Sequence, residues 1–362
     1  MMPTTRPSGL RRTGWGAGRP LLWAAAPLAL LLAAFPASAA GAQDRPGDAD
    51  RPPAEVSVPN SRQIELKSKI NGGRYTIDIA LPFADRPAKG YAVVYAFDGY
   101  ISFASVAEAV RAASEATPVV VVSIGYPQDE SWTDSVLKTK RPLPSTYDGV
   151  PDWRVAPSYR RLYDLSLPVT AGPDLDALNA MGLPALGDGD TGGLDDLLQI
   201  IEREVKPLVR DIVPVDTDKE VLFGHSLGGM AVVHAAFVEP DAFDVFIASS
   251  PSIWWNNRQV LQDEAAFAAA VRAGKTAPRI LITVASKEAG PDPSSPAWSV
   301  EAQAAWDSVG MVRNAHELAE RLRALPGRPG YEVEYARFDK VGHRLAIWAA
   351  LARGIDFAFG LE

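Results

Sequence analysis

The chain of 362 residues predicts an α/β protein with a mainly parallel, doubly wound sheet and an antiparallel N-terminal hairpin. Short, wholly apolar runs alternate with helix-like stretches, as in strands that are buried on both faces. An alternating polar and apolar pattern precedes them, and 47% of all residues are hydrophobic, which is enough for one large core. We therefore expect a single folded domain over residues 60–362.

The N-terminal 42 residues have the composition of a secretory signal peptide. Four arginines and no acidic residue precede the apolar run from Leu21 to Phe35, and small residues follow it. The run is shorter than the ~20 residues of a membrane-spanning helix, so we expect cleavage after Ala39 or Ala42 and no stable membrane insertion afterwards. The mature protein would be secreted or periplasmic, by the general or the twin-arginine route. Residues 43–59, rich in Asp, Pro and Arg, predict a flexible linker.

The folded domain begins with the hairpin, since residues 62–81 alternate about the turn at 71–73. The alternation of strands and helices that follows predicts the parallel part of the sheet. The expected strands are 91–97, 118–126, 220–226, 243–250, 279–286 and 331–338, and the expected helices are 103–116, 194–210, 227–238, 260–273, 300–325 and 344–358.

One interval, from about residue 127 to 193, interrupts this alternation. It is rich in Pro, Gly, Asp and aromatic residues, and it leaves the carboxyl end of a predicted strand. Ligands bind at that edge of an open α/β sheet, so we expect a lid-like insertion there, with a variable surface loop as the alternative.

Charge and cysteine content exclude several functions. The formal net charge is −8, and loss of the arginine-containing presequence would make it more negative, which disfavours binding to nucleic acid. The chain has no cysteine, so it has no disulfide, no thiol nucleophile and no thiolate metal site. We expect neither a metal nor an organic cofactor, and the sequence leaves the oligomeric state open.

The strongest local motif is Gly224-His225-Ser226-Leu227-Gly228, a G-x-S-x-G match. An apolar strand precedes it and a helix follows it, as a nucleophile elbow requires. The elbow places the Ser226 hydroxyl at the start of a helix, where the N–H of Leu227 can stabilise negative charge on an attacked carbonyl oxygen.

A serine nucleophile needs a base, and the chain has four histidines. His225 lies within the elbow and should point away from Ser226, whereas His234 and His316 lie in predicted helices, so we expect structural roles for all three. His343 follows the last predicted strand in a loop, which is where this fold supplies its base.

The acid should follow the strand at 279–286. We choose Glu288, which would orient the imidazole, with Asp292 as the alternative. The second oxyanion donor should follow the strand at 91–97, where the N–H of Gly99 or Tyr100 can approach a substrate.

Several separated strings resemble the esterase D-like branch of the α/β hydrolases, which includes siderophore trilactone esterases. They include YAVVYAFDGY, RRLYDLSLP, VLFGHSLGGMAVVHAAF and ASSPSIWWNN, in the family's order, and with the others they span about residues 60 to 358. The resemblance implies an α/β-hydrolase fold and supports the serine, histidine and oxyanion assignments above. By the same resemblance Trp254 and Trp255 lie near the site, with core packing as the alternative. Arg160, Arg161 and Asp164 match the family's R-x-Y-D-L string, which implies that they hold the loop over the site or meet an anionic substrate, with a structural salt bridge as the alternative. The stretch from 139 to 190 looks longer than in the family.

These observations predict a serine hydrolase that cleaves small-molecule carboxylic esters, including siderophore-type esters, through an acyl-enzyme. Two alternatives stay open. An acyltransferase would use the same residues with an alcohol in place of water, and a non-catalytic protein could bind its ligand on the same scaffold. The sequence does not specify the acyl or the alcohol part of the substrate.

Overall fold

The computed structural model describes residues 57–113, 117–127, 146–147, 150–151, 160–169, 189–291, 293–294 and 299–360. These residues belong to one compact unit, Val56–Glu362. The predicted signal peptide, most of the predicted linker and insertion, and Asp292 lie outside the described residues.

A central sheet of eight strands has the order β1-β2-β4-β3-β7-β8-β9-β10. The β1–β2 hairpin and the β2–β4 pair are antiparallel, and the pairs from β4 to β10 are parallel, so the predicted sheet is confirmed. The strands are Ser61–Lys67 (β1), Arg74–Ala80 (β2), Tyr91–Ala96 (β3), Val119–Gly125 (β4), Val215–His225 (β7), Val245–Ser249 (β8), Arg279–Ala285 (β9) and Glu332–Phe338 (β10). Thr146–Tyr147 (β5) and Val150–Pro151 (β6) form a separate pair.

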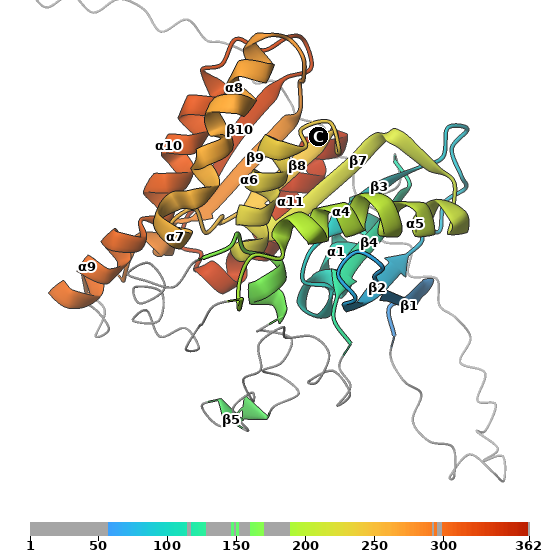
Figure 1. Ribbon diagram of the computed structural model, residues 1–362, viewed down its shortest axis with the longest axis horizontal. Helices are drawn as coiled ribbons and strands as arrows, with labels where there is room; N and C mark the ends of the chain where they lie inside the picture. The colour runs from blue at the N-terminus through green and yellow to red at the C-terminus, as the bar shows by residue number, and fades with distance from the viewer. Residues whose placement is uncertain are drawn as a thin grey trace, which may run out of the picture. The chain divides into compact units, whose positions relative to one another are not determined.

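Helices cover both faces of this sheet (Figure 1). On one face α1 and α11 pack against each other, and on the other α6 packs on β7 and β8 while α10 packs on β9 and β10. The helices are Gly99–Ala113 (α1), Leu194–Ile200 (α4), Lys206–Ile212 (α5), Leu227–Val238 (α6), Trp255–Arg258 (α7), Glu264–Arg272 (α8), Val300–Val309 (α9), Met311–Arg323 (α10) and His343–Phe359 (α11).

Each face of the sheet contributes to its own hydrophobic core, because side chains alternate along a strand. In β3, Val93 and Tyr95 belong to the core beneath α6 and α10, whereas Val94 belongs to the core beneath α1 and α11. The strands are therefore buried between two cores, and the carboxyl edge of the sheet can support a site.

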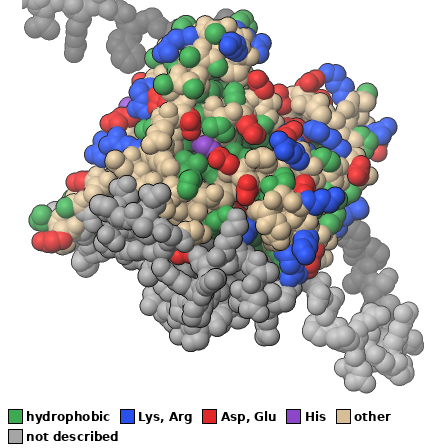
Figure 2. Space-filling view, viewed as in Figure 1, with side chains coloured by type: hydrophobic (Ala, Val, Ile, Leu, Met, Phe, Trp, Pro, Cys, Tyr) green, Lys and Arg blue, Asp and Glu red, His purple; other side chains and the backbone are tan. Residues whose placement is uncertain are grey.

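Figure 2 shows acidic and basic side chains interspersed over one surface of the molecule.

Two helices differ from the prediction. The expected helix 300–325 is divided at Gly310, whose φ of +58° lies in the left-handed region, so α9 and α10 are separate. The helix expected at 103–116 begins earlier, at Gly99, which brings its first N–H groups to the carboxyl end of β3. A further departure is the π-helical turn Ile201–Val205 between α4 and α5.

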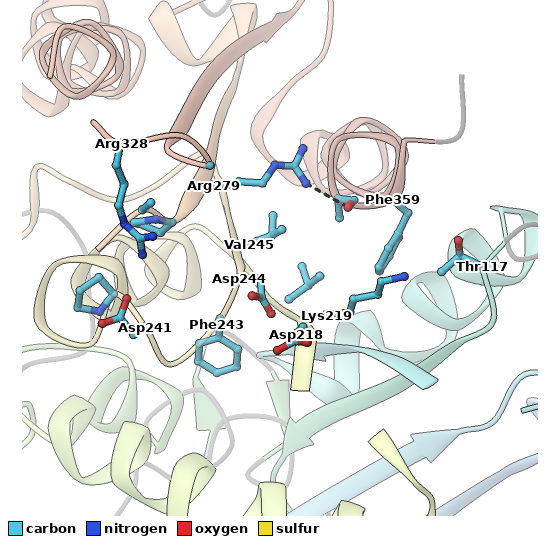
Figure 3. A pocket seen from close by; sticks show the side chains of 16 residues that line it. Thr117, Asp218, Lys219, Asp241, Phe243, Asp244, Val245, Arg279, Arg328 and Phe359 are labelled. Carbon is cyan, nitrogen blue, oxygen red and sulfur yellow. Dashed lines mark hydrogen bonds between the residues drawn. The ribbon is translucent and has the colours of Figure 1, made fainter. Parts of the chain in front are cut away.

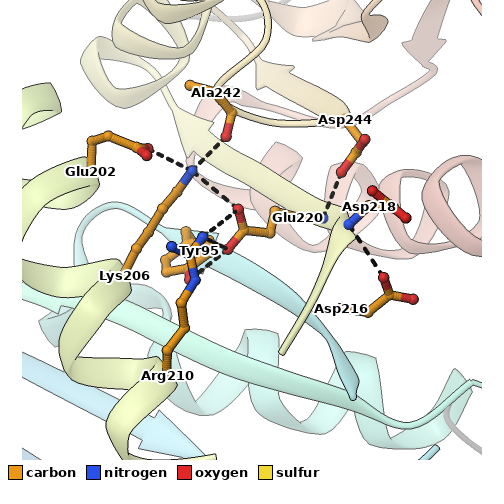
Figure 4. A network of polar contacts seen from close by, with 9 residues as sticks. All are labelled: Tyr95, Glu202, Lys206, Arg210, Asp216, Asp218, Glu220, Ala242 and Asp244. Carbon is orange, nitrogen blue, oxygen red and sulfur yellow. Dashed lines mark hydrogen bonds and ion pairs between the residues drawn. The ribbon is translucent and has the colours of Figure 1, made fainter. Parts of the chain in front are cut away.

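A buried ionic cluster fastens α5 to the sheet (Figure 4). Lys206, 1% exposed, pairs with Glu220 of β7 at 3.2 Å and with Glu202 at 2.7 Å. Tyr95 of β3 donates a hydrogen bond to Glu220 at 3.1 Å, and Arg210 lies 3.4 Å from the same carboxylate. Removing Glu220 or Lys206, the two buried members, would leave a buried charge with fewer partners, so we expect the cluster to constrain the structure.

Candidate active site

The site is built around a strained turn between β7 and α6. Ser226 has φ +61° and ψ −117°, a region that a residue with a side chain rarely adopts. A Cβ on Gly224 would lie 2.2 Å from the carbonyl oxygen of Gly228, and one on Gly229 would lie 2.5 Å from that of Ser249. Only glycine fits at these two close approaches, which explains the glycines on both sides of the serine.

His343 lies next to the serine, as the sequence predicts. It is the first residue of α11, and its Nε2 is 3.0 Å from Ser226 Oγ. Its Nδ1 forms a short hydrogen bond with a carboxylate oxygen of Glu288. Because a carboxylate only accepts hydrogen bonds, Nδ1 carries the proton and Nε2 is free to accept one from the serine hydroxyl.

Glu288 is buried, 1% exposed, in the 3₁₀ turn Ser286–Ala289 that follows β9. Its second oxygen accepts hydrogen bonds from the Ser250 hydroxyl at 3.0 Å and from the backbone N–H of Ala285 at 2.7 Å. These donors satisfy the buried carboxylate and fix its orientation toward His343. The structure thus joins Glu288, His343 and Ser226 in one hydrogen-bonded chain; the alternative acid, Asp292, lies outside the described residues.

The predicted oxyanion donors lie at the starts of two neighbouring helices. Leu227 is the first residue of α6, and Gly99 is the first residue of α1, with Tyr100 next to it. Their helices follow β7 and β3, which are adjacent parallel strands. N–H groups in the first turn of a helix have no intrahelical acceptor, so both helix starts can offer donors to an anionic oxygen.

An arginine joins these two helix starts. Asp98, which precedes Gly99 and has φ +61°, accepts two hydrogen bonds from Arg161, at 2.6 Å from Nε and 3.0 Å from Nη2. The same Nη2 lies 3.2 Å from the carbonyl oxygen of His225, inside the elbow. The sequence motif drew attention to Arg160, Arg161 and Asp164 together, and the structure places Arg161 of these three at the elbow.

His225 is closer to the reacting groups than we expected. Its ring packs against the ring of His343 with centroids 4.6 Å apart and a tilt of 38°, and its Nδ1 is 2.9 Å from the Ser249 hydroxyl. Burial lowers the pKa of His225 to about 3, and electrostatic interactions with His343 and Arg161 act in the same direction. His225 is therefore neutral near pH 7 and offers an uncharged ring face to the imidazole. The other two histidines lie elsewhere: His234 pairs with an aspartate of α4, and His316 packs on Tyr335 of β10.

The remaining predicted residues divide between the surface and the core. Trp254 is half-buried and its ring centroid lies 6.0 Å from that of Trp255, which is fully buried. Arg160 is also buried, 3% exposed, and pairs with Asp164 at 2.6 Å while donating to the Tyr75 hydroxyl. Burial raises the pKa of Asp164 to about 6, although Arg160 opposes that change. The surroundings of Arg160 and Trp255 are those of the structural alternatives, and their contact with substrate stays a prediction.

Two serines after β8 were not predicted from the sequence. Ser250, with φ +42°, supports Glu288, and the Ser252 hydroxyl lies 3.4 Å from Ser226 Oγ. The signal was present, because both follow a buried strand whose carboxyl end lies next to the elbow, in the string ASSPSIWW. Ser250 and Ser252 could have been predicted from their position after β8, because β8 is the parallel neighbour of β7 and both strands end at the same edge of the sheet.

Two hollows flank the sheet at opposite edges. One of about 580 Å³ touches Glu288 and is lined by Trp306, His316 and Tyr335, at the carboxyl edge. The other, of about 490 Å³, lies at the amino ends of the strands, and Lys219 is one of the residues that line it (Figure 3). Lys219 and Ser226 stand roughly 20 Å apart along β7, so only the first hollow adjoins the site.

Within the described residues, no group of three or more His, Cys, Asp or Glu side chains is placed to hold a metal ion. In the same part of the chain, no helix combines the length and the hydropathy that crossing a membrane requires.

Comparison with known proteins gives a consistent result. A family model described as "Putative esterase" matches residues 188–326. The ferri-bacillibactin esterase BesA of Bacillus subtilis is 26% identical over 312 residues, covering 83% of this chain and 90% of that protein. A siderophore enterobactin esterase of Emericella nidulans is 32% identical over 308 residues, covering 80% and 91%.

Solved structures show the same similarity. The siderophore hydrolase EstA from Aspergillus nidulans matches with a TM-score of 0.65 at 28% identity, covering 84% of this chain and 95% of that chain. The BES protein from Bacillus cereus matches with a TM-score of 0.63 at 25% identity, covering 85% and 99%. The similarity thus extends over nearly the whole length of these relatives, and the sequence-based family assignment is confirmed.

Proposed function

The chain belongs to the esterase family of α/β hydrolases and is a carboxylic ester hydrolase, and on that premise we propose that Ser226, His343 and Glu288 are its catalytic residues. The observation that carries the proposal is the hydrogen-bonded chain from Glu288 through His343 to Ser226 Oγ, with 3.0 Å between Nε2 and Oγ. Proton transfer between a base and a nucleophile requires this separation.

The reaction proceeds in two halves. Ser226 Oγ attacks the ester carbonyl while His343 Nε2 takes the hydroxyl proton, and Glu288 stabilises the resulting imidazolium without accepting the proton itself. The tetrahedral intermediate collapses when His343 returns the proton to the leaving alcohol. Water then attacks the acyl-enzyme with His343 again as base, which releases the acid and restores the serine.

The negative charge on the carbonyl oxygen needs preorganised donors. We assign them to the N–H of Leu227 and to that of Gly99 or Tyr100, because both helix starts lie at the same sheet edge as Ser226. Removing one such donor costs about 10²- to 10³-fold in kcat in other serine hydrolases.

For the substrate, we propose esters of the siderophore class. Support comes from the names of the relatives, which include esterases for ferri-bacillibactin, enterobactin and triacetylfusarinine C. Iron would then arrive as part of the substrate and would need no site of its own in the protein.

Active-site labelling tests the catalytic assignment. A fluorophosphonate probe should label the wild-type protein and should not label Ser226→Ala, with circular dichroism as the check that the variant is folded. Tight binding of a ferric siderophore without labelling or turnover would instead favour a non-catalytic binding protein.

A substrate panel tests the chemistry. Purified protein is assayed on ferric trilactones, aryl esters and alkyl esters of graded length, with products identified by mass spectrometry. We expect the trilactones to give the highest kcat/KM and free acids as products. Acyl-glycerol as the main product when glycerol is added would indicate an acyltransferase.

We further propose that the protein is exported and that residues 1–42 are removed. The arginines, the apolar run and the small residues of that segment support this proposal. N-terminal sequencing of the protein recovered outside the cytoplasm should begin at Ala40 or Gln43, and an intact N-terminus on that protein would contradict cleavage.

A further inference from the structure

The proposed oxyanion hole takes its donors from two loops that lie far apart in the chain, so the chain connectivity does not fix their separation. One donor follows β3 and the other follows β7, and each loop contains a residue with φ near +61°, Asp98 in the first and Ser226 in the second. Such conformations are strained and persist only where neighbouring groups hold them. Something must therefore fix the distance between the two loops.

The guanidinium of Arg161 contacts both loops at once. Nε and Nη2 form a two-pronged ion pair with the Asp98 carboxylate, and Nη2 also reaches the carbonyl oxygen of His225 in the elbow. The side chains of Arg161 and Asp98 are 18% and 8% exposed, so solvent screens the pair little. The Asp98 carboxylate also lies close to the elbow, since a Cβ added to Gly228 would be 3.5 Å from Asp98 Oδ2.

We infer that Arg161 is a positioning residue that holds the two halves of the oxyanion hole at a fixed separation. The inference rests on the proposed hydrolase function, and it adds a residue to that function that does not itself touch the reacting atoms. The planar guanidinium is essential, because its in-plane N–H groups donate to two carboxylate oxygens and to a carbonyl oxygen at the same time. A shift of about 1 Å at the donors would be enough to reduce the rate by up to about 10²-fold.

The test compares two ketone ligands, of which only one forms a covalent adduct with Ser226. With a trifluoromethyl ketone, Ser226 Oγ forms a bond to the carbonyl carbon, the hydroxyl proton passes to His343 Nε2, and the carbonyl oxygen becomes an anion in the hole. The matching methyl ketone binds without forming this adduct. The ratio of the two inhibition constants therefore reports oxyanion stabilisation separately from binding of the ligand.

We expect Arg161→Gln to reduce this ratio about 10-fold or more and to lower kcat with little change in KM. Arg161→Lys keeps the charge but loses the fork, so it should reduce the ratio nearly as much. A full rescue by lysine would show that charge alone matters and would overturn the inference.

The control is Arg321→Gln, which breaks a similar two-pronged pair on the surface. Arg321 contacts Glu264 at 2.7 and 2.8 Å, far along α10 from the elbow, and its loss should leave the ketone ratio unchanged. If Arg161→Gln fails to fold, Asp98→Asn gives the same test from the other side of the pair.

The outcomes separate this inference from the proposed function. A wild-type protein that discriminates neither ketone and is not labelled by fluorophosphonate would refute the hydrolase itself. A wild-type protein that forms the adduct, with the same ketone ratio in Arg161→Gln and Asp98→Asn, would refute only the role of Arg161.

Discussion

Glu288 and Glu220 are both buried carboxylates on the central sheet, but they face different partners. Glu220 contacts the cationic side chains of Lys206 and Arg210, whereas Glu288 contacts two neutral donors and the imidazole of His343. Histidine is the side chain that gains and loses charge near neutral pH. Glu220, paired with lysine and arginine, contributes to the fold, whereas Glu288, bonded to an imidazole, can also support proton transfer.

The largest effect should come from exchanging the acid at the site. Glu288→Gln keeps the shape of the side chain but allows the wrong imidazole tautomer, so we expect kcat to fall about 10²- to 10⁴-fold with a smaller change in KM. Steady-state kinetics on an aryl ester measure this. Unchanged turnover in Glu288→Gln, with loss of turnover in Asp292→Asn, would transfer the role to Asp292.

Removing a cation from the structural cluster should act on stability instead. Lys206→Met leaves Glu220 with Arg210 at 3.4 Å as its one cationic partner and with the Tyr95 hydroxyl as a neutral donor, so the free energy of unfolding should fall by about 3 kcal/mol, while kcat stays near the wild-type value. Urea denaturation and an ester assay at a temperature where the variant is folded check both parts. A large loss of kcat in the folded variant would erase the distinction between the two glutamates.

A smaller effect should follow from weakening the support of Glu288. Ser250→Ala removes one of the neutral donors to its carboxylate, and we expect kcat to fall about 10-fold because the carboxylate orients His343 less well. Ser250→Thr keeps the hydroxyl and should recover part of the loss. Equal rates in the alanine and wild-type proteins would mean that the Ala285 N–H alone is sufficient.

A last prediction concerns acid stability at His225. Its pKa is lowered to about 3 in the folded state, whereas an unfolded histidine titrates near 6.5. Between these values the unfolded chain binds the extra proton, so the stability contributed by neutral His225 is present above pH 6.5 and is lost as the pH falls toward 3. His225→Gln should show a shallower loss of unfolding free energy between pH 6.5 and 4.5, measured by denaturation at each pH. Parallel curves for the two proteins would contradict a buried, neutral His225.

Sequence patterns were sufficient for the fold and for the catalytic candidates because both depend on local or near-local constraints. Apolar strands, the glycines of the elbow and the position of His343 after the last strand are properties of short segments, and the sheet forms as they predict. The start of α1 at Gly99 was less predictable, because a helix boundary depends on tertiary contacts as well as on residue type.

The amino-acid sequence by itself determined the parallel sheet, the elbow at Ser226 and the histidine after the last strand, and it left Glu288 and Asp292 as candidates for the acid. Only the tertiary structure decided which neighbouring side chains support them: Arg161 of the two adjacent arginines, Ser250 against Glu288, and His225 against His343. The physical reason is that adjacent arginines on one helical turn point in different directions, and a strand pattern does not specify which hydroxyl meets a carboxylate across the sheet edge. Those pairings follow from packing between segments that lie far apart in the chain.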